Sequence, residues 1–257
     1  MRWTIGLGTL FGIPIRVHLS FLALLGYFLF AGFSVLGLLG AIWAGCLLVS
    51  LFALVVMHEL AHALVARRLG VGVRDILLLP IGGVARLERM PRSPGDEILI
   101  ALAGPLSNFA LAILLAPLVW LVHHQASQGS LSWQGVWVYV RQIFLLNLAL
   151  GTFNLAPAFP MDGGRVLRAL LARKLGYFRA TLIAAKVGRV LALSVMLGGL
   201  VFGHYWLACV ALFVLLAGHR EETITRAVLQ HHIERVRPPG PAEPDRDIEA
   251  KVLSDRG

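Results

Sequence analysis

Two histidines and a glutamate lie close together in an apolar stretch, VVMHELAHALVARRLG, at residues 55–70. His58 and His62 are four residues apart, so on a helix their side chains share one face, one turn apart. Two imidazoles at this spacing can bind one zinc ion, and Glu59, beside the first of them, can hold an attacking water. Ionisable side chains inside a membrane helix usually mark a functional site. Isolated polar contacts between helices are the alternative explanation.

A catalytic zinc ion needs a third protein ligand. The candidate is Asp162, in the stretch NLAPAFPMDGGRVLRAL at residues 154–170. Pro157 and Pro160 end a helix here, and the two glycines after Asp162 let the chain turn. The carboxylate can then face back towards the histidine pair. Taken alone, Asp162 could instead cap a helix; beside the histidine pair, the ligand interpretation is favoured, with one Zn²⁺ per chain.

The composition predicts that these residues lie in a membrane protein. Of the 257 residues, 58% are hydrophobic and 14% are charged, and the mean hydropathy is +0.77, whereas soluble domains carry about 25% charged residues. Apolar runs of about 20 residues are long enough to cross a bilayer as helices. The sequence therefore predicts an all-α polytopic membrane protein with six transmembrane helices, near 19–39, 41–66, 97–122, 138–157, 181–202 and 205–218.

Lysines and arginines predict the orientation of these spans. They gather in segments 1–18, 67–96, 158–189 and the tail after residue 216, whereas the opposite loops carry only Arg141. This asymmetry places both termini in the cytoplasm. His58 precedes Arg67 by nine residues and would lie about 13 Å into the bilayer, near its cytoplasmic side. The net charge of +9 is then mostly a topology signal, and binding to nucleic acid is not favoured because no aromatics are interleaved with the basic residues.

The chain divides into a core at residues 1–218 and a cytoplasmic end at 219–257. Within the core, segment 71–96 has short β-favouring runs on either side of Pro80, Gly82 and Gly83, which predicts a membrane-associated hairpin. An ordinary interfacial loop is the alternative. Residues 219–235 could form a short surface helix, and the Pro-rich, charged residues 237–257 are typical of a disordered tail.

Together these motifs resemble the site-2 protease family of intramembrane zinc metalloproteases. The resemblance rests on HELAH in a span, NLAPAFPMDGG after a later one and PIGGVA between them, and GIPIRVHLSF and AGPLSN are also similar to prokaryotic members. It implies that His58, His62 and Asp162 are the zinc ligands and that Glu59 is the catalytic base. It implies further that Asn154 lies near the metal and helps to hold the substrate or its oxyanion.

The activity implied by the resemblance is cleavage of a transmembrane segment of a membrane-anchored protein, as in regulated intramembrane proteolysis. A substrate helix must unwind before attack, and the strand-like segment 76–86 offers an edge that can take the unwound part as an extra strand. We therefore expect substrate contacts at Ile81, Gly82, Gly83 and Val84. Many relatives carry a nucleotide-binding regulatory pair of domains or a PDZ domain, and we expect neither in these 257 residues.

Other functions compete with proteolysis. A membrane metal transporter also places histidines and carboxylates in spans, although its ligands are usually spread across the membrane. An inactive relative could bind clients without cutting them.

Asn108, after Gly104 and Pro105, is expected to form a hydrogen bond between helices and not to act in catalysis. The expected location is a bacterial or archaeal plasma membrane, with lipid and a transmembrane substrate as partners; a homo-oligomer is also compatible with the sequence.

Overall fold

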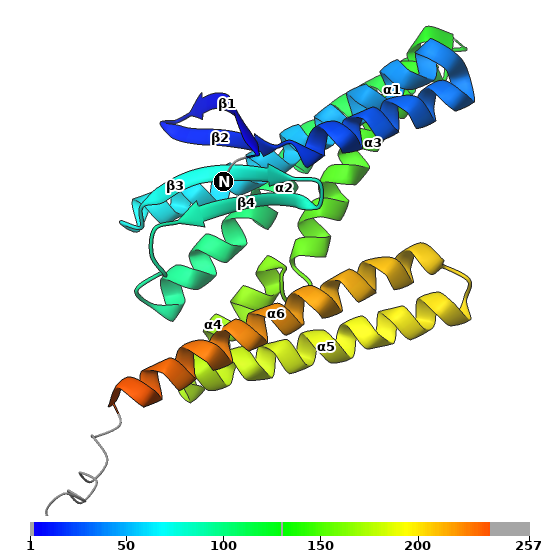
Figure 1. Ribbon diagram of the computed structural model, residues 1–257. Helices are drawn as coiled ribbons and strands as arrows, with labels where there is room; N and C mark the ends of the chain where they lie inside the picture. The colour runs from blue at the N-terminus through cyan, green and yellow to red at the C-terminus, as the bar shows by residue number, and fades with distance from the viewer. Residues whose placement is uncertain (1–2, 130, 237–257) are drawn as a thin grey trace, which may run out of the picture.

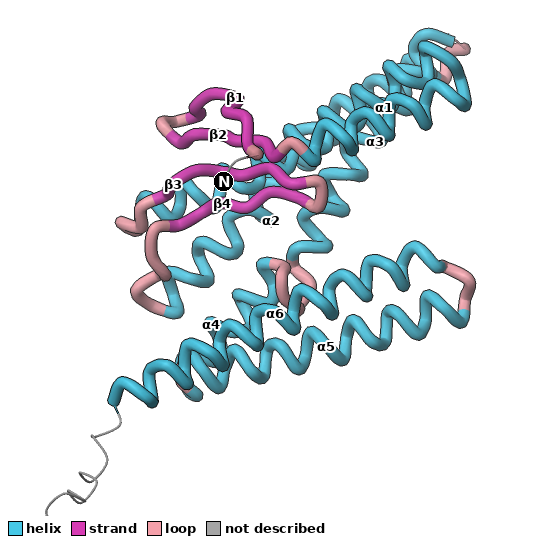
Figure 2. Tube along the Cα trace, in the orientation of Figure 1, coloured by secondary structure: helices cyan, strands magenta, loops and turns pink. Residues whose placement is uncertain are grey.

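The computed structural model describes residues 3–129 and 131–236 and is mostly helical, with one small sheet (Figures 1 and 2). Its elements, in chain order, are β1 (Thr4–Leu10), β2 (Ile13–His18), α1 (Ser20–Arg68), β3 (Val73–Leu79), β4 (Gly82–Leu87), α2 (Pro94–Ala126), α3 (Leu131–Asn154), α4 (Asp162–Leu175), α5 (Tyr177–Val201) and α6 (Tyr205–Val236). The predicted tail at 237–257 lies outside the described residues.

Helix α1 is a hairpin of two helical arms. Its helical geometry breaks at Leu36 and Gly37, and Gly37 has a φ of 61°, a conformation that favours glycine. The arms pack closely beyond this turn, because a Cβ on Gly32 would overlap the backbone of Gly40. The dark blue and lighter blue arms run side by side in Figure 1. The second arm carries the histidine pair near its end.

Four strands form a mixed sheet in the order β1-β2-β3-β4. β1 and β2 pair antiparallel, β2 and β3 pair parallel, and β3 and β4 form the predicted antiparallel hairpin. The all-α prediction is therefore wrong in one respect, because residues 4–18 add two strands. β1 contains two glycines and is mostly exposed, so its sequence lacks the hydrophobic alternation that predicts a strand. β2 buries alternate residues, the pattern of a half-buried strand.

The sheet packs on the second arm of α1 through an apolar core. This core joins β2 and β3 to the helix and contains Ile13, Ile15, Val17, Ile76, Leu78, Leu48, Phe52 and Val55. Strand β4 lies at one edge of the sheet, next to the part of α1 that carries the histidines. The burial of β2 and β3 thus fixes β4 beside the candidate site.

A buried carboxylate on β3 holds the β3–β4 hairpin together and links it to β2. Asp75 on β3 is 2% exposed and accepts hydrogen bonds from Arg86 on β4, and Arg16 on β2 lies 3.4 Å from the same carboxylate. The hydrogen bond from Arg86 keeps the pKa of Asp75 below its usual value. Three strands are therefore joined by charge as well as by the backbone ladder.

Among the described residues, four helices are long and apolar enough to cross a membrane: α1, α2, α3 from Trp133 onwards, and α5. α6 is not among these four, so the predicted count of six spans stays a prediction, although α1 contributes two arms. α6 is continuous from Tyr205 to Val236, and the boundary predicted at residue 218 falls inside it. α5 packs against both α6 and α4.

Candidate metal centre

The second arm of α1 places two imidazoles side by side, as their spacing predicts. His58 and His62 are 3% and 4% exposed, and their Nε2 atoms are 3.1 Å apart. Glu59 lies one residue along the same turn and lines the cavity beside them. The helical spacing alone therefore brings the two nitrogen donors together.

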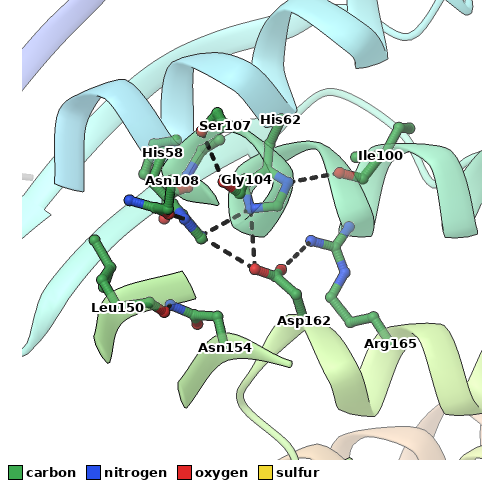
Figure 3. Close-up of polar contacts among 12 residues, drawn as sticks. His58, His62, Ile100, Gly104, Ser107, Asn108, Leu150, Asn154, Asp162 and Arg165 are labelled. Atoms are coloured by element: carbon green, nitrogen blue, oxygen red, sulfur yellow. Dashed lines mark hydrogen bonds and ion pairs between the residues drawn. The ribbon is translucent and has the colours of Figure 1, made fainter. Parts of the chain in front are cut away.

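Asp162 completes the group from the first residue of α4. Its Oδ2 atom lies 3.1 Å from Nε2 of His58 and 3.0 Å from Nε2 of His62 (Figure 3). The glycines that follow it are required for this approach, because a Cβ on Gly163 would overlap the carbonyls of Leu155 and Ala156. The compact turn between α3 and α4 thus brings a distant carboxylate to the histidines.

Helix α2 fixes both imidazoles from behind. Nδ1 of His58 is 2.5 Å from Oδ1 of Asn108, and Nδ1 of His62 is 2.6 Å from the carbonyl oxygen of Ile100. Both oxygens accept, so each Nδ1 carries a proton, and Nε2 is the nitrogen of each ring left on the side of Asp162 to bind a metal ion. Gly104 lets α2 come this close, since any Cβ there would overlap the His62 ring.

These three side chains fit a metal ion by their chemistry and by their arrangement. One donor atom from each of His58, His62 and Asp162 lies within 4.8 Å of the other two, and all three residues are buried. Two neutral imidazole nitrogens and a carboxylate oxygen form a usual zinc ligand set. The group could therefore hold one metal ion with a position left for water.

Arg165 and Asn154 extend the site on the side of α3 and α4. The Arg165 guanidinium is 3.5 Å from Oδ1 of Asp162, the oxygen that faces away from the histidines. Asn154 donates to the carbonyl of Leu150 at 2.9 Å and lines the same cavity (Figure 3). Sequence reasoning missed Arg165, although its spacing of three residues from Asp162 places both on one helical face.

Strand β4 contacts the candidate base directly. The backbone N–H of Ala85 donates to Oε2 of Glu59 at 2.8 Å. Gly83 also packs on α1, since a Cβ there would lie 2.6 Å from Cγ of Glu59. The sequence predicted a strand near the site but not this contact, because it depends on how β3 and β4 dock on α1.

Two cavities that share part of their walls reach this centre. The inner one has a volume of about 180 Å³ and contains His58, Glu59, His62, Asp162 and Arg165 in its wall. The outer one, of about 360 Å³, is bounded by α1, the end of α3 and α6, and its lining includes the predicted substrate residues Ile81, Gly82, Gly83 and Val84. The predicted site residues, Asn154 included, therefore line these two cavities.

Comparisons with known proteins agree with this arrangement. The sequence profile of Peptidase family M50 matches residues 46–129 and 121–195. A zinc metalloprotease of Methanocaldococcus jannaschii is 40% identical over 224 residues, which cover 87% of this chain and 62% of that protein. Rip3 of Mycobacterium tuberculosis is 38% identical over 247 residues, with 87% and 60% covered. The chain thus spans about three fifths of the length of these curated relatives.

A solved structure shares the fold. The site-2 protease from Methanocaldococcus jannaschii aligns with a TM-score of 0.63 at 38% sequence identity, and the alignment covers 86% of this chain and 95% of that one. The profile match spans more than half of the residues and includes both the histidine helix and the aspartate turn. The chain therefore belongs to Peptidase family M50, the family of the site-2 proteases.

Proposed function

We propose that this protein is an intramembrane zinc metalloprotease that cleaves transmembrane segments of membrane-anchored proteins. One observation carries the proposal: a buried group of two histidines and an aspartate, able to hold a metal ion, lies with a glutamate at the end of the longest apolar helix. The relatives named as zinc metalloproteases support it. The further proposal that its substrates are signalling proteins rests on the family resemblance alone.

In this proposal His58, His62 and Asp162 are the metal ligands and Glu59 is the base. When bound, zinc lowers the pKa of a water molecule and polarises a carbonyl group. Glu59 takes the proton of the attacking water and later delivers it to the leaving amine. Asn154, which lines the same cavity, can donate to the substrate or to the developing oxyanion once its side chain leaves the Leu150 carbonyl.

We infer that the substrate binds as an extended strand on β4. The N–H of Glu88 donates to Gly72 next to β3, whereas the N–H of Ala85 points the other way, to Glu59. Because strand residues alternate, Gly83 and Ala85 present their backbone groups at the free edge. The outer cavity beside this edge is largely apolar, which suits side chains from a transmembrane segment.

This edge is closed in the described conformation. Neighbouring strands need about 4.7–4.9 Å between their backbones, but Glu59 is in direct hydrogen-bond contact with Ala85. A substrate strand can therefore pair here only if the β3–β4 hairpin and α1 separate, or if Glu59 moves. Substrate capture and release of the base from Ala85 are then the same event.

Ala85→Pro is expected to weaken substrate capture, because it removes the edge N–H without replacing any group that faces the metal. We expect a higher KM, with zinc content unchanged. Ala85→Gly keeps the N–H and is the matched control. Val84→Pro should also impair capture, but the Val84 N–H faces β3, so this change disturbs the hairpin itself. A KM for Ala85→Pro equal to that of Ala85→Gly would argue against strand addition.

The proposed topology keeps six spans, with α6 as the sixth, and places both termini in the cytoplasm. The basic residues at the span ends support this orientation. In this orientation the metal ligands lie near the cytoplasmic side of the plasma membrane.

The metal-transporter alternative needs successive ligand sites along a path through the membrane. Among the described residues, the single group of three metal-capable side chains is the one at His58, which favours one reaction centre. An inactive, client-binding relative is separated from a protease by the experiment below.

Removal and return of the metal test the proposal. Purified protein in lipid vesicles is incubated with an embedded test substrate, and the product mass is recorded. Cleavage within the transmembrane segment is expected to stop after treatment with a chelator and to return with one equivalent of Zn²⁺. Cleavage that persists without metal would refute a metalloprotease. Bound zinc without cleavage of any substrate would favour client binding, and zinc flux across the vesicles would favour a transporter.

A further inference from the structure

Behind the metal ligands lies a polar chain that the proposed reaction does not use. Asn108 on α2 and Asn147 on α3 are 2% and 0% exposed, and they bond to each other in the interior of the helix bundle. Burying two carboxamides is costly unless all their groups find partners. The hydrogen bonds of these two asparagines run from Asn147 to Asn108 and from Asn108 to His58.

The order of this chain is set by a backbone carbonyl. Nδ2 of Asn147 donates to the carbonyl oxygen of Asn108 at 2.6 Å, and a carbonyl can only accept. Oδ1 of Asn147 must then face Asn108, where it accepts from Nδ2 at 2.7 Å. That contact turns Oδ1 of Asn108 towards Nδ1 of His58, at 2.5 Å. Each amide is therefore held in one of its two orientations.

These hydrogen bonds between Asn147, Asn108 and His58 determine which nitrogen of the neutral His58 ring carries the proton. Because Oδ1 of Asn108 can only accept, Nδ1 of His58 must donate, so in the neutral imidazole Nε2, on the side of Asp162, is the nitrogen with the lone pair for a metal ion. A flipped Asn108 would offer N–H to Nδ1 and move the proton to Nε2. A protonated Nε2 cannot bind a metal ion. Asn147 does not contact His58, but its orientation sets that of Asn108. It thus decides whether Nε2 of His58 is free to bind a metal ion.

We propose that Asn108 and Asn147 are positioning residues that lock the His58 ring in its metal-binding tautomer, with Asn147 acting only through Asn108. This inference rests on the proposed function in that it takes His58 as a zinc ligand. It goes further in assigning a role in metal affinity to α3, through a residue that contacts neither the ligands nor the substrate cavity. Loss of such an outer partner typically lowers metal affinity by about 10- to 100-fold.

Zinc affinity, measured by competition with a chromogenic chelator on the purified full chain, tests the proposal. We expect Asn108→Leu to lower the affinity by about 10- to 100-fold and Asn147→Leu to lower it by a similar factor. Asn108→Asp keeps an oxygen that accepts from Nδ1 of His58, so it should retain most of the zinc affinity that Asn108→Leu loses. Ser107→Ala is the matched control, since this neighbouring hydroxyl donates to the Gly104 carbonyl and takes no part in the Asn147–Asn108–His58 bonds; this variant should bind zinc like the wild type.

A purely structural role for the two asparagines predicts a different pattern. Asn108→Leu and Asn147→Leu would then lower the melting temperature of the metal-free protein while leaving its zinc affinity at the wild-type value, and this result overturns the proposal. If the leucine variants do not fold, the comparison rests on Asn108→Asp and Asn147→Ser, of which only the second should lose affinity. Absence of zinc binding in the wild type would instead refute the proposed function.

Discussion

Glu59→Gln is expected to abolish cleavage while leaving the zinc site occupied. Glutamine has the same shape as glutamate, and its amide oxygen can still accept from the Ala85 N–H, so the contact between α1 and β4 is retained. It cannot take a proton from water at neutral pH. Loss of a general base costs about 100- to 10,000-fold in rate, so we expect no detectable product in the time that the wild type needs for complete cleavage.

The measurement compares product formation and zinc content in the same preparations. Glu88→Gln makes the same chemical change on an exposed residue outside both cavities, so it should cleave like the wild type. If Glu59→Gln loses zinc as well as activity, the glutamate supports the metal site and its role as a base is not demonstrated. Normal turnover by this variant would remove Glu59 from the mechanism.

The parts of the site that sequence could predict are those set by local spacing. His58 and His62 meet because they are one helical turn apart, and Asp162 faces inward because prolines and glycines around it leave the chain few other paths. The β3–β4 hairpin was also predictable, because its apolar runs flank a Pro–Gly turn. In each case the residues that determine the geometry lie within a few positions of one another.

What the sequence did not predict depends on tertiary contacts between distant segments. The sequence predicts a hydrogen bond from Asn108 to another helix, and Asn108 does bond to Asn147 on α3. Its contact with His58 depends on which face α2 turns towards α1 and on the close approach that Gly104 permits. β1 was missed because an exposed, glycine-rich strand has little hydrophobic alternation. The contact of Glu59 with Ala85 needs the whole sheet to be docked on α1.

Asp162→Ala is expected to lose the metal while the helices stay folded. Asp162 contributes the one oxygen that lies within 3.1 Å of both imidazole Nε2 atoms, and two histidines alone are a poor zinc site, since zinc sites in proteins usually have three or four protein ligands. The change also leaves Arg165 facing the empty position, and a cation there repels Zn²⁺. Both effects lower the affinity, so we expect less than a tenth of the wild-type zinc content after dialysis, by elemental analysis.

A graded pair of variants separates loss of the ligand from loss of structure. Asp162→Asn keeps an oxygen in place but removes the charge, so its zinc content should fall between those of the wild type and Asp162→Ala. Replacing Arg165 with Gln in the Asp162→Asn background removes the repelling cation and should recover part of the zinc. The metal-free variants should keep their helices by circular dichroism, because Asp162 lies in the first turn of α4 but the helix has no side-chain cap to lose; their melting temperatures report the lost contacts with His58, His62 and Arg165. Full zinc occupancy in Asp162→Ala would exclude this residue as a ligand.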